Sequence, residues 1–214
     1  MFSGTDAKQA VAQVDWSFAS DAILIEIHAD DLLNRYDTQA HTILLGVFQT
    51  ADADTFRKFV ADPAAMSKAL ANAEPNPAIL KAVRYVVQPG RHTILSIDRA
   101  AKAKVVGVVA GFYSMDVKSS ARLFEIPLAI SNDATFGHNY VAQPQTLALR
   151  LDLGQSEITA ATRLNPEPPE LAAAQKKALE TTQVVPLDGG GREILLTPAN
   201  SDDAAGAAAI QLPN

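Results

Sequence analysis

The sequence predicts an all-β protein, in which two antiparallel sheets form a sandwich with a short helical insertion and a C-terminal extension. Three observations support this fold class. Apolar residues alternate with other residues in several short runs, as they do in strands that bury one face. Turn-forming residues separate these runs, and residues 52–73 alone interrupt the β-type middle of the chain with the apolar spacing of helices. We expect residues 1–160 to form the sandwich domain and residues 161–214 the extension.

Two runs show the alternation most clearly. In residues 145–153, leucine occupies every second position from 147 onward, and in residues 21–28 isoleucine occupies positions 23, 25 and 27. Neighbouring side chains of a strand point to opposite faces of its sheet, so each run gathers its large aliphatic residues on one face. We therefore expect two strands whose leucine and isoleucine faces line the core.

The middle of the chain predicts further strands. Residues 82–87 and 93–97 flank the turn Gln88-Pro89-Gly90-Arg91 and are expected to form a hairpin, because Pro fixes φ and Gly allows a positive φ. Residues 105–113 are apolar on both faces, which predicts a central strand, and their glycines indicate close packing of another element. Residues 121–130 predict a strand whose internal proline confines it to an edge or a bulge.

Residues 52–73 predict two short helices inserted between strands. Their apolar residues recur at spacings of three and four, and Asp62-Pro63 resembles an N-cap followed by a first-turn proline. Prolines at 75 and 77 prevent the second helix from continuing. The apolar stripe of these helices should cover the outer face of the sheet behind residues 105–113.

The C-terminal extension has a different composition, rich in Pro and Ala. Residues 170–180 have high helix propensity but a narrow apolar face, which indicates a surface helix. Residues 183–187 and 193–197 flank Asp188-Gly189-Gly190-Gly191, a plausible second hairpin. Residues 200–214 are rich in Ala, Asp and Gly and are expected to be a mobile end.

Composition excludes several functional classes. The net charge of −6 and the absence of a basic run argue against nucleic-acid binding, which depends on clustered Lys and Arg. No stretch of 18 apolar residues predicts a transmembrane helix, and the N-terminus lacks the pattern of a secretory signal, so we expect a soluble chain. The absence of cysteine removes disulfides, thiolate metal sites and cysteine nucleophiles together.

No catalytic constellation is apparent. The four histidines, at 28, 41, 92 and 138, lack the spacing of a zinc site and are expected to be isolated structural residues. Asp30, Asp31 and Asp37 lack the pattern of a calcium loop, and no G-x-S-x-G motif occurs. We therefore predict no metal, no cofactor, no small-molecule substrate and no enzymatic activity. A hydrolase that uses Asp30, Asp31 and His41 is the enzymatic alternative.

The strongest candidate for function is the connection at residues 29–40. It joins two predicted strands with more residues than a tight turn needs, and long loops on a rigid scaffold are often functional. Its mixture of Leu, Tyr, Arg and acidic residues resembles a protein-binding tip. The alternative is that both leucines simply tuck into the end of the sandwich. The candidate partner-binding residues are Asp30, Asp31, Leu32, Leu33, Asn34, Arg35, Tyr36, Asp37, Thr38 and Gln39.

Several spaced blocks resemble the outer-membrane lipoprotein family of bacterial type VI secretion systems, TssJ. The blocks are LNRYDTQAHTILLGVFQ at 33–49, TF at 55–56, VQPG at 87–90, IDRA at 97–100, VGVVAGFY at 106–113 and RLFEIP at 122–127. They follow one another in order over residues 22–154, which makes chance agreement improbable.

The resemblance implies a periplasmic sandwich of transthyretin-like topology at the periplasmic face of the outer membrane. It implies binding to the periplasmic C-terminal part of the inner-membrane subunit TssM, with TssL as an indirect partner. In the family the connection between the first two strands takes part in binding, which here is the connection at residues 29–40. The loops at 88–91 and 114–119 should open at the same end if neighbouring strands are antiparallel.

Two departures from the family pattern stand out. The family's mature chain begins with a lipid-bearing cysteine, whereas Thr5 stands where that cysteine is expected, and we expect a soluble form without signal peptide and lipid anchor. The resemblance also says nothing about residues beyond 160. The alternative function is a secreted carbohydrate-binding module, which is disfavoured because Trp16 is the only tryptophan.

Overall fold

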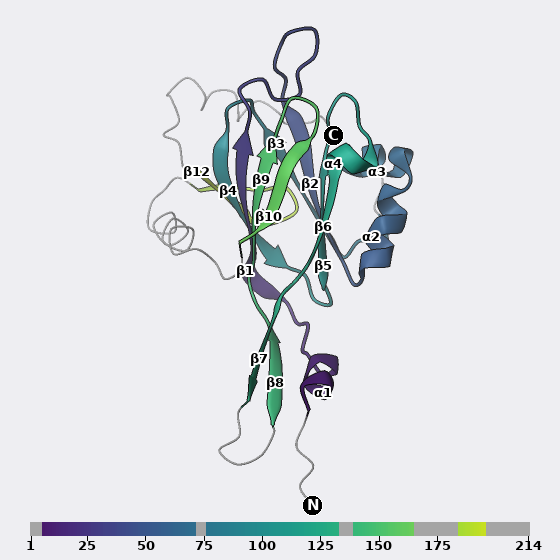
Figure 1. The fold of residues 1–214 in the computed structure, drawn as a ribbon, viewed down its shortest axis with the longest axis vertical. Helices are drawn as coiled ribbons and strands as arrows, with labels where there is room; N and C mark the ends of the chain where they lie inside the picture. The colour runs from purple at the N-terminus through teal and green to yellow at the C-terminus, as the bar shows by residue number, and fades with distance from the viewer. Residues whose placement is uncertain (1–5, 72–75, 133–138, 165–183, 196–214) are drawn as a thin grey trace, which may run out of the picture.

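The computed structural model describes residues 6–71, 76–132, 139–164 and 184–195, and it shows two β-sheets packed face to face (Figure 1). The predicted β-sandwich is confirmed. The larger sheet contains, in spatial order, β10 (Ile158–Arg163), β9 (Leu147–Leu153), β1 (Ala19–Ala29), β4 (His92–Arg99), β12 (Arg192–Leu195) and β11 (Val184–Pro186). The smaller sheet contains β3 (Lys81–Val87), β2 (Ile43–Thr50), β5 (Val105–Ala110) and β6 (Ala121–Glu125).

The core lies between the two sheets and follows the predicted alternation. The isoleucines of β1 and the leucines of β9 are all buried in one cluster with the inner faces of β2, β3, β4 and β5. β1 and β9 run parallel, whereas the other strand pairs of the described residues are antiparallel. This pair differs from the antiparallel expectation because β9 begins beside the start of β1, with Leu147 opposite Ile23. The two strands therefore run in the same direction.

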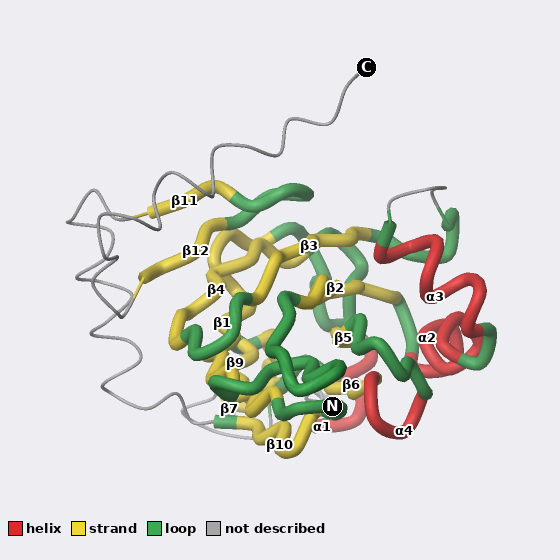
Figure 2. Tube along the Cα trace, turned by 90° about the horizontal axis from the view of Figure 1, so that it is seen from above, coloured by secondary structure: helices red, strands yellow, loops and turns green. Residues whose placement is uncertain are grey.

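Two helices cover the outer face of the smaller sheet, as predicted (Figure 2). They are α2 (Ala53–Val60) and α3 (Pro63–Leu70), and the carboxylates of Asp52 and Asp62 cap their first turns. Phe56 packs directly over β5 at Gly107, where an added Cβ would lie 1.9 Å from the ring atom Cε2. The predicted close approach to this central strand is therefore an aromatic ring from α2. None of the helices in the described segments has the length and apolar character needed to cross a membrane.

The predicted hairpin between residues 82–87 and 93–97 is wrong. Its two strands exist as β3 and β4, but β3 pairs with β2 in one sheet and β4 with β1 in the other. Gly90 adopts the expected positive φ of 69°, so the predicted turn is present although the two strands do not pair with each other. The physical reason is that β3 and β4 each have one buried face. The turn places β4 in the opposite sheet, so the two buried faces pack against each other across the core.

The prediction of one strand over residues 121–130 is also wrong, because this segment forms two separate strands. It divides at Pro127, because Pro lacks the N–H group that a continuing ladder requires. β6 ends before this proline and stays at the edge of the smaller sheet. β7 (Leu128–Asn132) pairs with β8 (Tyr140–Pro144) in a separate hairpin beside α1 (Ala7–Ala12), at the opposite end of the molecule from residues 30–42 (Figure 1).

The larger sheet continues past residue 160. β10 pairs with β9, and β11 and β12 form an antiparallel pair whose β12 lies against β4. Glu193 of β12 is buried and accepts hydrogen bonds from Tyr85 of β3 and Thr93 of β4, which ties this strand to both sheets. The predicted helix at 170–180 and the predicted mobile end at 200–214 lie outside the described residues.

Candidate partner-binding surface

The connection between β1 and β2 lies at one end of the sandwich and is held in shape by hydrogen bonds between its own residues. The carboxylate of Asp30 accepts the N–H of Leu32 at 2.7 Å, and the carbonyl of Leu33 accepts the N–H of His41 at 2.9 Å. The side chain of Leu33 is fully buried in the core. The connection is therefore a folded structure, and Leu33 is its anchor.

Three neighbouring loops bond to this connection. The N–H of Gly90 donates to the carbonyl of Asp30 at 3.1 Å, and the N–H of Arg35 donates to the carbonyl of Gln155 at 2.8 Å. The N–H of Tyr113 donates to the carboxamide oxygen of Asn34 at 2.7 Å. The loops after β3 and β5 thus reach the same end as this connection, although the second makes its contact at Tyr113, just before the predicted range 114–119. The loop at 154–157 joins them. We call the meeting place of residues 30–42, 88–91, 111–116 and 154–157 the loop end.

Asn34 connects three parts of the loop end. It adopts a positive φ of 49°, a region in which Asn is among the least strained side chains. Its amide nitrogen donates to the carbonyl of Thr42 at 3.3 Å, while its oxygen accepts the Tyr113 N–H. Its own N–H donates to Gly154 at 3.4 Å. Asn34 is buried, so its side chain holds the surrounding loops together from within.

The exposed side chains of the loop end form an amphipathic surface. Tyr36 is 50% exposed and Tyr113 72%, and their ring centroids lie 4.3 Å apart. Leu32 of the same connection is 39% exposed, and His41 lies with its ring centroid 6.5 Å from that of Tyr36. The remaining exposed members of the predicted set are Asp30, Asp31, Arg35, Asp37, Thr38 and Gln39.

An apolar groove continues from Tyr113 along the outer side of the smaller sheet. Its volume is about 890 Å³, and its walls come from α3, β2, β3 and the segment after β5. Leu44 and Val86 line it and are 38% and 42% exposed. Sequence reasoning missed this groove because its walls are far apart in the chain. The one available signal was that Leu44 and Val86 are apolar at outward-facing strand positions.

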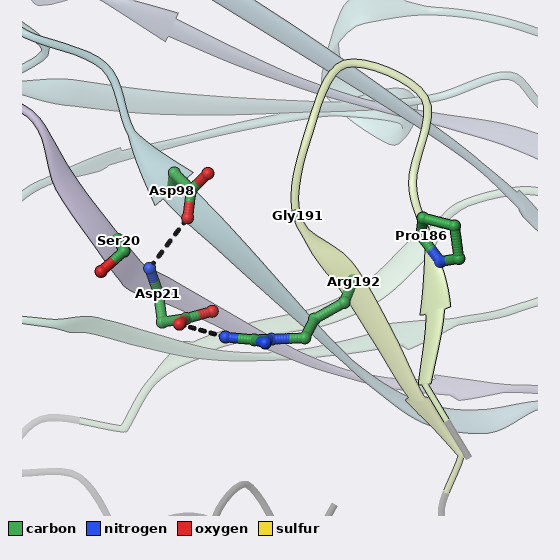
Figure 3. A pocket seen from close by; sticks show the side chains of 6 residues that line it. All are labelled: Ser20, Asp21, Asp98, Pro186, Gly191 and Arg192. Carbon is green, nitrogen blue, oxygen red and sulfur yellow. Dashed lines mark hydrogen bonds and ion pairs between the residues drawn. The ribbon is translucent and has the colours of Figure 1, made fainter. Parts of the chain in front are cut away.

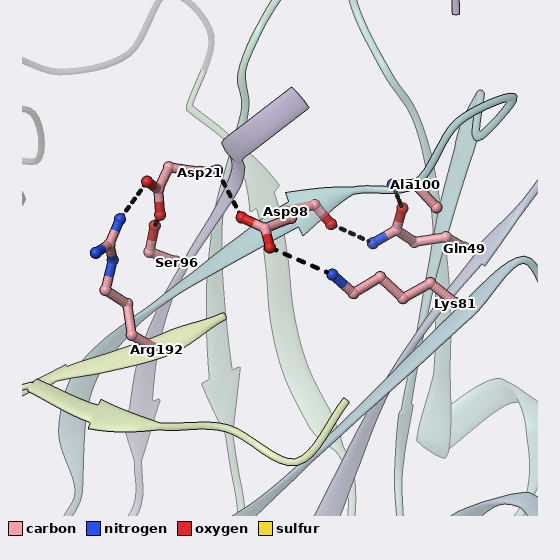
Figure 4. A network of polar contacts seen from close by, with 7 residues as sticks. All are labelled: Asp21, Gln49, Lys81, Ser96, Asp98, Ala100 and Arg192. Carbon is pink, nitrogen blue, oxygen red and sulfur yellow. Dashed lines mark hydrogen bonds and ion pairs between the residues drawn. The ribbon is translucent and has the colours of Figure 1, made fainter. Parts of the chain in front are cut away.

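A polar network at the other end of β1 joins the two sheets. Asp21 forms an ion pair with Arg192, and its N–H donates to Asp98 at 3.1 Å (Figure 3). Its carboxylate also accepts from the Ser96 hydroxyl at 2.7 Å (Figure 4). Asp98 also pairs with Lys81 of the smaller sheet at 3.6 Å (Figure 4). The Asp98 carbonyl further accepts from the Gln49 amide at 2.8 Å. The carboxylates of Asp21 and Asp98 therefore have structural partners in both sheets.

The enzymatic alternative gains no geometric support. Asp30 caps its own loop, and His41 lies beside Tyr36. Within the described segments, the only group of three acids or histidines whose donor atoms come together consists of Glu26, His28 and His92. The expectation that the histidines are isolated is therefore wrong for His28 and His92. Sequence spacing could not reveal this, because β1 and β4 bring together residues that are distant in the chain.

Comparison with known families decides the identity of the chain. A family model described as type VI secretion lipoprotein, VasD, EvfM, TssJ matches residues 21–152 of the 214-residue chain. The chain belongs to the TssJ family of type VI secretion lipoproteins. The resemblance inferred from the sequence blocks is confirmed. TssJ-family membership makes this chain an envelope component of a type VI secretion system, with an outer-membrane-associated place in the periplasm.

Several solved structures are similar to this TssJ-family chain. The lipoprotein TssJ1 of Pseudomonas aeruginosa is 18% identical with a TM-score of 0.49, over 71% of this chain and 98% of that one. Lip of Serratia marcescens, a membrane bound component of the type VI secretion system, is 17% identical with a TM-score of 0.47, over 69% and 96%. A chain in a structure described as the TssM C-terminal domain from EAEC is 17% identical with a TM-score of 0.44, over 66% and 96%. No curated protein sequence matches the chain.

Proposed function

We propose that this TssJ-family chain is a structural adaptor of the type VI secretion envelope complex. A lipid anchor holds it at the periplasmic face of the outer membrane, and its loop end binds the periplasmic C-terminal part of TssM. TssL is an indirect partner through TssM. The observation that carries the proposal is the pair of exposed tyrosines Tyr36 and Tyr113, whose rings contact each other on a hydrogen-bonded loop platform.

The chemistry of this surface suits a protein partner. Exposed aromatic side chains with a neighbouring Arg and Leu are the residue types that dominate binding energy at protein interfaces. The backbone of the loop end is already hydrogen-bonded to its neighbours, so a partner does not have to order it. Binding to a preorganised surface avoids much of the entropic cost of association.

The groove beside Tyr113 extends the proposed surface. Leu44, Val86 and Met115 offer it apolar contacts, while Arg84 and Asp188 add a charged pair at 2.9 Å. A standard interface buries about 800 Å² on each partner, more than one loop supplies. The exposed loop residues and the groove together provide a continuous surface for one TssM segment.

Calorimetric titration with the periplasmic C-terminal part of TssM tests the proposal. Tyr36→Ala and Tyr113→Ala should each weaken binding roughly 30-fold, the effect of losing about 2 kcal/mol at a hot spot. Phe18→Ala is the matched control, because Phe18 is an aromatic residue with 60% exposure just before β1, away from the loop end. This control should bind as the wild type does.

Equal affinities for the Tyr36, Tyr113 and Phe18 variants would refute the loop-end assignment, and no binding by the wild type would refute TssM as the partner. A glycan array tests the carbohydrate-binding alternative. Trp16 does not offer an open platform for a sugar, because Arg99 and Lys104 lie 5.6 and 5.8 Å from the centroid of its ring. The exposed tyrosine pair is the surface that a glycan hit would have to depend on.

A further inference from the structure

We propose that Glu26, His28 and His92 form a binding site for a divalent transition-metal ion of the zinc type. The site lies on the outer face of the larger sheet, close to where β1 enters the loop end. Two imidazole nitrogens and one carboxylate oxygen make up a ligand set that suits Zn²⁺ and its neighbours better than Ca²⁺ or Mg²⁺. The inference does not depend on TssM binding.

The strand pairing of the larger sheet creates this cluster. Glu26 and His28 are two residues apart on β1 and therefore point to the same face. His92 of β4 stands directly opposite His28 in the antiparallel register. Ile25 and Ile27 fix that register, because a slip by one residue would turn them outward and carry the polar side chains into the core.

The donor atoms already lie near the positions that a metal ion requires. The Nε2 atoms of His28 and His92 are each 3.0 Å from Oε1 of Glu26, and the two ring centroids are 4.0 Å apart. All three donor atoms lie within 4.8 Å of one another. A tetrahedral zinc ion with bonds of about 2.1 Å separates its ligand atoms by roughly 3.4 Å. Small side-chain movements would thus admit the ion.

Exposure and neighbouring groups also fit a metal site. The side chains of His28 and His92 are 41% and 42% exposed, which gives an ion access from solvent, while Glu26 is 12% exposed. Arg150 donates its Nε to the other carboxylate oxygen of Glu26 at 2.9 Å and so orients Oε1 toward the imidazoles. Such support of a ligating carboxylate is common around metal ions.

The protonation states allow the exchange of hydrogen bonds for metal bonds. The Glu26 carboxyl group contacts both imidazoles and the Arg150 guanidinium through its two oxygens, an environment that favours its ionised form. Each neutral imidazole carries one proton, and placing it on Nδ1 leaves the lone pair of Nε2 for the metal. Arg150 places a positive charge nearby, which moderates the affinity for a cation.

The test uses the chain without any histidine tag and Zn²⁺ as the probe. Calorimetry should give one Zn²⁺ per chain, and nuclear magnetic resonance of the imidazole nitrogens should show shifts at His28 and His92. His28→Gln and His92→Gln should each weaken binding at least tenfold. His41→Gln is the matched control, an exposed histidine on the loop end, and should leave the affinity unchanged.

Two results would overturn the site. One is a chain that binds no Zn²⁺ at millimolar concentration, and the other is binding that His28→Gln and His92→Gln leave intact. Circular dichroism checks that both variants fold, which is expected because their side chains lie on the sheet surface. Visible absorption of the Co²⁺-loaded wild type provides a second readout, since direct imidazole and carboxylate ligation gives bands that aqueous Co²⁺ does not show.

Discussion

Replacing Asn34 with Ala should destabilise the fold and disorganise the loop end. The substitution removes the acceptor of the Tyr113 N–H and the donor to the Thr42 carbonyl. Each of these two partly buried hydrogen bonds contributes about 0.5–1.5 kcal/mol, so losing both costs about 1–3 kcal/mol. Holding Ala at a positive φ of 49° adds about 1 kcal/mol. The free energy of unfolding should therefore fall by about 2–4 kcal/mol, a large share of the stability of an ordinary domain.

Urea unfolding followed by fluorescence measures this loss, and two further variants separate its causes. Asn34→Gly should lose the same hydrogen bonds but recover about 1 kcal/mol, because Gly tolerates a positive φ. Asn34→Asp keeps an acceptor for Tyr113 and should be the mildest of the three. If Asn34→Ala unfolds within about 0.5 kcal/mol of the wild type, the assignment of Asn34 as the central connection of the loop end is wrong.

Three further predictions concern packing and acid stability. Gly107→Ala should destabilise the fold by about 3 kcal/mol, because the new Cβ would overlap the Phe56 ring, whereas Gly111→Ala should cost less, since the nearest atom to its Cβ lies at 3.2 Å. Thermal unfolding compares the two. Leu33→Ala should cost about 2–5 kcal/mol as a fully buried leucine, and an effect below 1 kcal/mol in urea unfolding would contradict its role as the anchor. The Glu26 pKa is lowered from 4.5 to about 2 in the folded chain, so its contribution is present above pH 4.5 and is lost as the pH falls toward 2. Glu26→Gln should remove roughly 2 kcal/mol of this acid-dependent stability, and an unchanged pH profile of unfolding would contradict the reasoning.

Local patterns predicted the elements of this fold better than their pairing. The leucines of residues 145–153 and the isoleucines of residues 21–28 line the core as expected, because alternation follows directly from strand geometry. The cap of the second helix at Asp62 was also predicted, since capping is a local interaction. The turn at 88–91 misled because turn residues indicate a change of direction and do not state which sheet the next strand joins.

In the candidate site, too, local features were predicted and contacts between distant residues were missed. The connection at residues 29–40 was recognisable from its length and its mixed side chains. The contributions of Tyr113 and of the loop at 154–157 were not, because they depend on hydrogen bonds between residues far apart in the chain. The burial of Asn34 was equally invisible, since a single sequence gives no sign that a polar side chain bonds inward. The pairing of His28 with His92 depends on the register of β1 and β4, which no local motif encodes.

The structure of the loop end also indicates how its sequence can change. The backbone of residues 30–42 bonds inward through Asp30, Asn34 and Arg35, while the side chains of Tyr36 and its neighbours point to solvent. The inward bonds keep the loop end in one shape, so replacing an exposed side chain should change the contacts with the proposed partner and leave that shape unchanged. An exchange at Asn34 or Leu33 does the opposite, since it leaves the exposed chemistry intact and removes the support beneath it. Changes that adapt the surface to a new partner should therefore occur at the exposed positions. Variants at Asn34 and Leu33 should weaken binding only to the extent that they disorder the loop end.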